Sequence, residues 1–403
     1  MILFFIINVH SLLQQRYKTE IIVRTISNFW NLEKIDSFVE KCVVNKVNIV
    51  SVSFKQDEDE SYISGSLFYS SSIGPVAEDI YSNTNMMEYL ISKCHNNSIK
   101  VYAWIPQFHD QAALLKNSEW KMMYLENGIL KQYKGSNPNF PQYFVNPINS
   151  DLQNYELSII KEIVDSFSID GVMLDWLRFD SFNMDLSDYT RDKYIAKYGK
   201  DPINFDFSLV DNSNYTQLEE WNNWRTEFIG DYVRRVRETI GNNIVLGAYV
   251  LSPFWTDVGQ DVSKFQQYID LISPMCYFED FKEQRNWVYK ENGIIDLTIK
   301  KSKESKIRPV LSTHWTSDDY DDVLAHIASK YPSIESLSVF YYHEWGTKQF
   351  SLINNISMLM KEVPEQQKPN NSIYFIIAGF CVVICAIVFF IYPKQKNEFI
   401  KTI

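Results

Sequence analysis

The chain has 403 residues, of which 45% are hydrophobic, and it carries a formal net charge of −11. This length exceeds that of one small domain and suits one barrel with additions. The acidic balance argues against nucleic acid as a partner, because phosphate binding needs a basic face.

The N-terminus carries a predicted signal peptide. Residues 2–9 form a short apolar run, and Val9, His10 and Ser11 fit a small-residue cleavage pattern, so residues 1–11 are expected to be removed on secretion. The run is short, however, and no basic segment precedes it. The alternative is a first barrel strand, or a wrongly assigned start codon.

Short β-branched runs then alternate with helical patterns, which predicts βα units and a parallel sheet. The runs lie at 20–26, 47–54, 100–105, within 168–180, and at 243–250, 271–277, 307–312 and 336–342. The helical patterns between and after them lie at 32–46, 85–96, 151–167, 217–240, 262–268, 283–305, 317–330 and 347–361, with an inserted one at 186–198. A doubly wound sheet would also alternate. Eight units and two long early loops favour an α/β fold of the (β/α)8 TIM-barrel type over residues 19–361.

The C-terminus carries a predicted single transmembrane helix at residues 372–392, about twenty residues without a charge, which suffices for a hydrocarbon core of ~30 Å. A polar linker, 362–371, precedes it, and a lysine-containing tail, 393–403, follows it. By the positive-inside rule the tail is cytoplasmic. The sequence thus predicts a single-pass membrane protein whose barrel lies on the extracellular or lumenal side.

Cysteines are sparse outside the predicted span. Cys42 and Cys94 each fall on a predicted helix, and the two helices would be neighbours, so the pair is either a disulfide or two half-buried thiols. Glycosylation sequons occur at Asn96, Asn214, Asn355 and Asn370. The predicted extracellular or lumenal compartment would allow their glycosylation, so a glycoprotein is expected.

Side chains that follow the eight strands meet at one end of a barrel, where TIM-barrel enzymes carry their active sites. Aromatic rings stack on the apolar faces of sugars, so a bowl rich in tryptophan and acids predicts a carbohydrate site. The alternative is that the tryptophans fill the barrel end as core. Those at the strand ends are Trp30, Trp104, Trp176, Trp255, Trp315 and Trp345. The predicted substrate-binding residues are Tyr69, Trp104, His109, Trp176, Arg178, Asp180, Tyr249, Trp255, Tyr277, His314, Trp315, His343 and Trp345.

Glycosidic cleavage normally needs two carboxyl groups, one to protonate the leaving oxygen and one to act as nucleophile or to activate water. Asp175 is the first catalytic candidate, because it ends an apolar strand and its burial needs a functional or paired explanation. A salt bridge to Arg178 is the structural alternative. Glu279 and Glu344 are the candidate partners, for catalysis or for simple hydrogen bonding. Asp170 is expected to be a turn residue at the start of the same strand.

No cofactor is expected. His109, His314 and His343 would need a carboxylate to make a metal site, and their separations fit no zinc motif, so no metal site is predicted. We expect these histidines to bond sugar hydroxyls or to tune a carboxylate.

Four segments resemble the bacterial family-10 glycosyl-hydrolase-like domain, in the order of that family. They are YFVNPINSDLQNYELSIIKEIVDSFSIDGVMLDWLRFD at 143–180, LFYSSSIGP at 67–75, HNNSIKVYAW at 95–104 and VGQDVSKFQQYIDLISPMCY at 258–277. Ser98 stands where that family usually has glycine. The resemblance implies a (β/α)8 glycosidase-like barrel with Asp175 in its site.

The chain is more distantly similar to family 18 chitinases, whose fourth strand reads D-G-x-D-x-D-x-E. Met173 replaces the middle aspartate here, and Leu177 replaces the catalytic glutamate. The departure excludes the substrate-assisted mechanism of that family as normally drawn. Three functions therefore stay open: a glycosidase that acts through carboxylates, a non-catalytic carbohydrate-binding surface receptor on the same barrel, and a metal-dependent deacetylase.

Overall fold

The computed structural model describes residues 13–57, 62–135, 137, 139, 141–209, 216–303, 305–342 and 348–362. The chain divides into two units, residues 16–359 and the two terminal segments 1–15 and 360–403. In the terminal unit, β1 (Leu13–Gln15) pairs antiparallel with β13 (Met360–Glu362). The predicted signal peptide, transmembrane helix and tail lie outside the described residues. Within the described part of the chain, no helix is both long enough and apolar enough to cross a membrane.

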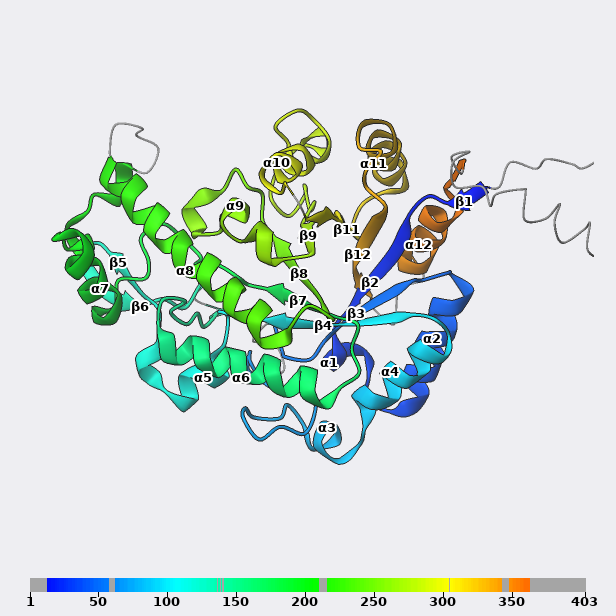
Figure 1. Ribbon diagram of the computed structural model, residues 1–403, viewed down its shortest axis with the longest axis horizontal. Coiled ribbons are helices and arrows are strands. Elements are labelled where there is room, and N and C mark those ends of the chain that lie inside the picture. Colours follow the sequence, from blue (N-terminus) through cyan, green and yellow to red (C-terminus); the bar gives the residue numbers. More distant parts are fainter. Residues whose placement is uncertain are drawn as a thin grey trace, which may run out of the picture. The chain divides into compact units, whose positions relative to one another are not determined.

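A parallel sheet of nine strands forms the centre of the unit 16–359, with helices along its outside (Figure 1). In spatial order the strands are β10 (Lys306–Ile307), β9 (Leu271–Pro274), β8 (Val245–Val250), β7 (Gly171–Asp175), β4 (Lys100–Pro106), β3 (Ile49–Ser53), β2 (Lys18–Val23), β12 (Ser336–Tyr342) and β11 (Val310–Ser312). Most of these strands are buried along almost their whole length, as expected for a parallel sheet that is covered on both faces.

The sheet curls back on itself because one stretch of chain supplies both of its ends. β10 pairs with β9, and β11 pairs with β12, yet only Arg308 and Pro309 separate β10 from β11. Met275, just after β9, also bridges to Val310. Taken as one strand, β10 and β11 correspond to the predicted run 307–312. All eight predicted runs are therefore strands of one TIM-barrel-like α/β sheet.

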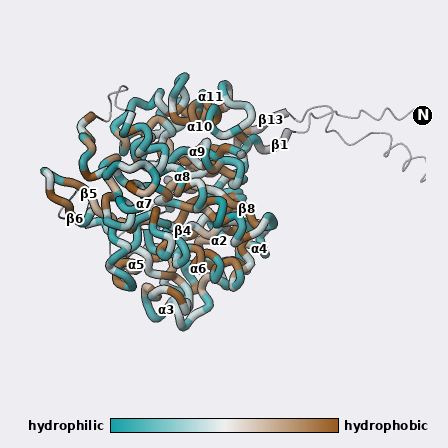
Figure 2. Tube along the Cα trace, turned by 60° about the vertical axis from the view of Figure 1, so that its left-hand side comes forward, coloured by the Kyte–Doolittle hydropathy of each residue, from teal (hydrophilic) through white to brown (hydrophobic). Residues whose placement is uncertain are grey.

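The predicted helices are present, most of them with small shifts at their ends, but the helix predicted at 283–305 is confined to 294–301. They are α2 (Leu32–Val44), α4 (Met86–Asn96), α6 (Ser150–Ser166), α8 (Thr216–Ile240), α9 (Val262–Phe265), α10 (Ile294–Lys301), α11 (Ser317–Lys330) and α12 (Lys348–Met358). Along α10 and α11 hydrophobic and hydrophilic residues are mixed, as in helices with one buried face (Figure 2). The α11 helix begins where the sequence predicted, because Thr316 and Asp319 form a capping box.

Two connections carry most of the added structure. The connection from β4 to α6 holds α5 (Gln111–Lys116) and a hairpin of β5 (Met123–Glu126) and β6 (Ile129–Gln132). The connection from β7 to α8 holds α7 (Asp188–Tyr198). A bridge between Tyr124 and Met184 joins the hairpin to the second connection. The short helices α1 (Thr25–Asn28) and α3 (Asp79–Asn83) lie in the first two connections.

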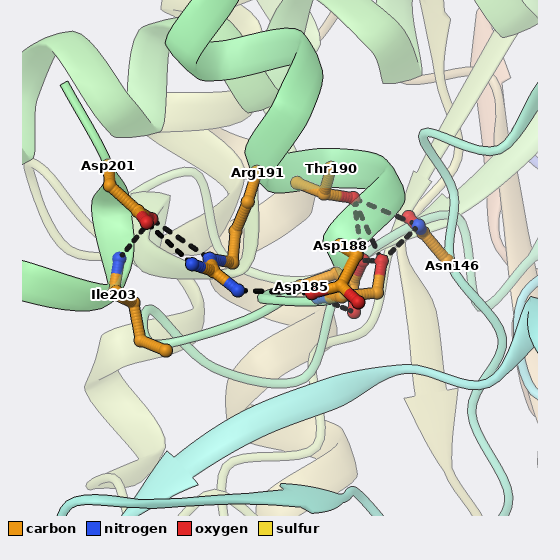
Figure 3. A network of polar contacts seen from close by, with 8 residues as sticks. Asn146, Asp185, Asp188, Thr190, Arg191, Asp201 and Ile203 are labelled. Atoms are coloured by element: carbon orange, nitrogen blue, oxygen red, sulfur yellow. Dashed lines mark hydrogen bonds and ion pairs between the residues drawn. The ribbon is translucent and has the colours of Figure 1, made fainter.

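A polar network fixes the second connection around α7 (Figure 3). The buried carboxylate of Asp185 accepts a hydrogen bond of 2.6 Å from Thr190, whose oxygen in turn accepts one of 2.9 Å from Asn146. Arg191 pairs with Asp201 at 2.5 Å. Burial raises the pKa of Asp185, and its hydrogen bonds oppose that shift. The part of the connection that carries α7 is therefore tied to the loop before α6.

A second polar cluster lies under the loops that follow β3 and β4. The Nζ atom of Lys55 lies 2.7 Å from Asp110 and 2.6 Å from Glu156 on α6, and all three side chains are fully buried. Burial opposes the charge of Lys55, but the two carboxylates outweigh it and raise the lysine's pKa. Gly65 packs directly on this cluster, where a Cβ atom would lie 2.0 Å from Asp110. The part of the loop that carries Gly65 is thus held against the cluster.

The three cysteines that the structure describes, Cys42, Cys94 and Cys276, are free and buried. The helices that carry Cys42 and Cys94 are neighbours, as predicted. The disulfide is not formed, so the alternative of two thiols is correct, and both are more deeply buried than expected.

Replacing Lys55 by methionine is expected to lower the free energy of unfolding by about 3–5 kcal/mol, because the buried acidic groups of the cluster lose their counter-charge. Urea unfolding at pH 7 measures the change. The matched control is Lys131→Met on β6, whose ion pair with Glu126 is nearly half exposed and should contribute less than about 1 kcal/mol. Equal losses in the two variants would contradict the assigned role of the cluster.

Candidate active site

A cavity of about 260 Å³ opens at the carboxyl ends of the strands. Its lining comes from the ends of seven strands and the loops that follow them, as in TIM-barrel enzymes. The lining combines apolar and aromatic side chains with a few charged ones, the usual composition of a small-molecule site. The lining residues are Ile22, Arg24, Asp57, Trp104, Asp175, Trp176, Arg178, Tyr249, Leu251, Met275, Tyr277, Phe281 and Phe340.

Asp175 is the last residue of β7, and its carboxylate has two well-placed donors. The indole N–H of Trp104 donates to one oxygen at 2.9 Å, and the backbone N–H of Trp176 donates to the other at 2.7 Å. Burial raises the pKa of Asp175 to about 7, and the charge of Asp57 acts in the same direction. These two hydrogen bonds and Arg178 oppose the shift without cancelling it. Near neutral pH the carboxyl group therefore exists in both protonation states.

A second carboxylate, Asp57, lines the same cavity from the loop after β3. Its side chain is almost fully buried and accepts two hydrogen bonds from Arg24, at 2.8 Å and 3.0 Å. Arg24 directly follows β2 and also lines the cavity. A buried carboxylate that is paired in this way keeps its negative charge close to a compensating one.

Arg178 is held in the wall of the cavity by contacts on two sides. Its guanidinium lies over the ring of Trp176, 4.6 Å from the centroid, and its Nη1 atom is 2.5 Å from Asp180. Tyr133, which follows β6, donates a hydrogen bond to the same Asp180. The structural alternative, a salt bridge between Arg178 and Asp175, is therefore wrong: Arg178 pairs with Asp180 and acts on Asp175 only through its charge.

The floor and walls of the cavity are aromatic. Tyr277 stacks on Phe340 with ring centroids 5.4 Å apart, and Phe340 meets the edge of Trp104 at 6.0 Å. The hydroxyl group of Tyr249 lies 3.4 Å from Glu20, a buried carboxylate inside the barrel. The rings are therefore fixed by one another and by the barrel interior.

The structure brings together six of the predicted residues: Trp104, Asp175, Trp176, Arg178, Tyr249 and Tyr277. Asp180 lies directly behind Arg178, and His109 packs against Trp176 with ring centroids 4.7 Å apart. These two residues therefore support the wall rather than line it.

Other predicted residues lie away from the lining. Tyr69 is buried and donates to Glu162 at 3.0 Å, and Trp315 is buried against Phe278. Trp255 packs between Phe281 and Trp287. His314 and Glu279 are exposed and do not line the cavity. Of the five described tryptophans at strand ends only two line it, so core packing explains more of this set than the sequence suggested. His343, Glu344 and Trp345 lie outside the described residues.

Sequence reasoning missed the pair Arg24 and Asp57. Asp57 begins an acidic run, 57–60, which reads as a solvated loop. Two features of the sequence could have indicated this pair. Asp57 lies just after the second strand, and Arg24 is the single arginine at the end of the apolar first strand.

Replacing Asp175 by asparagine is expected to raise the free energy of unfolding at pH 8 and to leave it nearly unchanged at pH 4. The folded-state pKa of about 7 exceeds the ordinary value near 4, so the native chain loses stability as the pH rises between these values. The full shift corresponds to at most about 4 kcal/mol, and the gain will be smaller because the carboxylate is partly open to the cavity.

Urea unfolding at the two pH values tests this expectation. Asp280→Asn, at an exposed position after β9, is the control and should show no such difference between them. An equal gain at both pH values would mean that the Asp175 carboxylate is not desolvated in the folded chain.

Comparisons with known proteins agree with this architecture. The glycoside hydrolase domain of PgaB (BpsB) from Bordetella bronchiseptica superposes with a TM-score of 0.62 at 11% identity, over 80% of this chain and 94% of that one. The catalytic domain of the β-amylase from Paenibacillus polymyxa gives 0.57 at 10% identity, over 88% of this chain and 99% of that one. At these identities the likeness shows the fold alone.

Two comparisons rest on sequence. An S-layer-related protein of Niallia circulans is 28% identical over 144 residues, which are 32% of this chain and 9% of that protein. This chain thus spans less than a tenth of that relative. A family model described as "Putative glycosyl hydrolase domain" matches residues 22–314, more than half of the chain. The matched range includes every residue that lines the cavity except Phe340. The chain therefore belongs to this glycosyl hydrolase domain family.

Proposed function

We propose that the protein is a glycoside hydrolase in which Asp175 is the general acid and Asp57 is the second carboxylate. The observation that carries this proposal is that two carboxyl groups in one cavity have opposite surroundings. Asp175 is desolvated, with a pKa raised to about 7, whereas Asp57 is paired with Arg24. Pairs of acids with surroundings that differ in this way divide the roles of acid and base.

The chemistry follows from these states. A protonated Asp175 gives its proton to the glycosidic oxygen as the bond to the sugar breaks, and an ionised Asp57 attacks the anomeric carbon or activates a water molecule. The negative charge of Asp57 also raises the pKa of Asp175, so the two groups support each other's roles. The separation of their carboxylates decides whether the sugar configuration is retained or inverted.

Asp57 takes the role that was predicted for Glu279 or Glu344. Glu279 has weaker support, since its side chain is exposed and outside the lining. Glu344 stays a prediction. The aromatic walls would hold a sugar ring, and Arg178 would donate hydrogen bonds to it, because only its Nη1 side is occupied by Asp180 and a backbone oxygen.

The likeness to family-10-type barrels and the more distant one to family 18 chitinases belong to the same proposal. Leu177, at the position of the chitinase glutamate, is fully buried and serves as core. This is also the observation that favours the second candidate, a sugar-binding surface receptor without turnover. The receptor predicts glycan binding that survives Asp175→Asn, with no hydrolysis by the native chain.

We expect Asp175→Asn and Asp57→Asn each to lower kcat/KM by at least about 10²-fold, the usual contribution of acid–base catalysis. Release of reducing ends from soluble starch, xylan, glycol chitin and carboxymethyl cellulose measures the activity. The rate of the native enzyme should fall as the pH rises through about 7, because Asp175 then loses its proton. Glu279→Gln is the control and should retain activity. Native activity in Asp175→Asn would refute the assignment.

The proposed location is a membrane surface, with the barrel outside or in a lumen. It rests on the uncharged stretch 372–392 and the apolar N-terminus, and the S-layer-related relative is consistent with a cell surface. A chain that ends at Glu362 should move from the membrane pellet to the soluble fraction after carbonate extraction. The full-length chain is the control, and its recovery in the soluble fraction would argue against the anchor.

A further inference from the structure

Two aromatic side chains in loops that follow barrel strands are exposed to solvent. Phe254, in the loop after β8, is 76% exposed, and Trp30, in the connection after β2, is 41% exposed. In the sheet order three strands separate β8 from β2 through β7, and three also separate them through β12, with β10 and β11 taken as one. Both rings follow the carboxyl ends of their strands. They therefore belong to opposite sectors of the end that carries the cavity.

The loop that carries Phe254 is continuous with the cavity wall. Leu251, three residues earlier, lines the cavity, and the adjacent Trp255 packs on Phe281, another lining residue, with ring centroids 4.8 Å apart. The backbone N–H of Trp255 donates to the carbonyl oxygen of the buried Ser252 at 2.9 Å. Trp255 is thus fixed in the cavity wall, whereas the ring of the preceding Phe254 is exposed to solvent.

Trp30 is similarly close in sequence to the other side of the cavity. Arg24, which lines the cavity, precedes α1, and Trp30 follows that helix. The ammonium group of Lys34 lies over the indole ring, 4.7 Å from its centroid, so a polar group is in contact with the partly exposed ring. Aromatic rings with adjacent polar groups suit sugar units, which offer an apolar face and a rim of hydroxyl groups.

The volume of the cavity points in the same direction. At about 260 Å³ it lies below the range of about 300–1,000 Å³ that encloses a drug-sized ligand, so a chain of several sugars must extend beyond it. We propose that Phe254 and Trp30 are stacking platforms for sugar units on either side of the one in the cavity, so that the substrate is an oligosaccharide or polysaccharide bound across the barrel mouth. This inference rests on the proposed glycoside hydrolase function.

Affinity electrophoresis of the full-length chain in detergent tests the platforms without relying on turnover. The Asp175→Asn background prevents hydrolysis, and the native gels contain soluble starch, xylan, glycol chitin or carboxymethyl cellulose. We expect at least one polysaccharide to retard the protein. Adding Phe254→Ala or Trp30→Ala should weaken the apparent affinity about tenfold, the effect of losing one aromatic stacking contact.

Two controls separate stacking from general exposure of apolar surface. Phe254→Tyr keeps the ring and should restore retardation. Val44→Ala changes a residue that is also 76% exposed but ends α2, at the opposite end of the barrel, and it should have no effect. A hexasaccharide of the retarding polymer should compete at least about tenfold better than its monosaccharide.

Unchanged retardation in both alanine variants, equal competition by monosaccharide and hexasaccharide, or no retardation by any of the polymers would overturn the inference. These outcomes are distinct from failure of the proposed function. A native chain that binds polymers through Phe254 and Trp30 but never cleaves them would refute the hydrolase and support the platforms. A variant that lacks both rings but cleaves the polymers with unchanged kcat/KM would support the hydrolase and refute the platforms.

Discussion

A lysine without access to water joins three parts of the barrel mouth. Lys55 extends from the end of β3 to Asp110 in the loop after β4 and to Glu156 on α6. With two acids and one base, the cluster avoids an excess buried charge only if one acid is protonated, and burial accordingly raises the pKa of Glu156 well above its usual value. Such clusters are a poor source of net stability, but their geometry is demanding. Asp57 is only two residues beyond Lys55. The position of Lys55 in the cluster therefore restricts where the carboxylate of Asp57 can lie.

The two acids of the cavity owe their difference to their neighbours. Asp175 ends a strand whose other residues are buried and apolar or glycine, and this surrounding favours the neutral carboxyl group. Asp57 comes from a polar loop and meets the guanidinium of Arg24. A single strand cannot supply both surroundings, whereas the ends of β3 and β7, which lie on either side of β4, can. The desolvation that suits Asp175 for proton transfer also makes the charged site less stable, which is the usual conflict between activity and stability.

The sequence predicted what depends on periodicity and missed what depends on direction. Alternating runs located all eight strands, and the end of the fourth run located Asp175. The rule that strand ends face one bowl gives a position along the chain, however, and not the direction of a side chain. Trp315 therefore turned out to be core and Trp255 a support for Phe281, although both follow strands. Asp57 was missed because its acidic neighbours mark a solvated loop, and only the buried partner Arg24 shows otherwise.

The barrel interior explains how the cavity floor is held. Barrels of this type are usually filled by aliphatic layers, but here Glu20 lies at the centre, 3.0 Å from Arg308 and hydrogen-bonded by Ser51 and Ser338. Tyr249 reaches this network from above with its hydroxyl group and presents its ring to the cavity. A polar network has fewer equivalent packings than an aliphatic layer, because each donor needs its acceptor. The aromatic floor is therefore held in place by the barrel interior, and the surroundings that raise the pKa of Asp175 are set without any bound ligand.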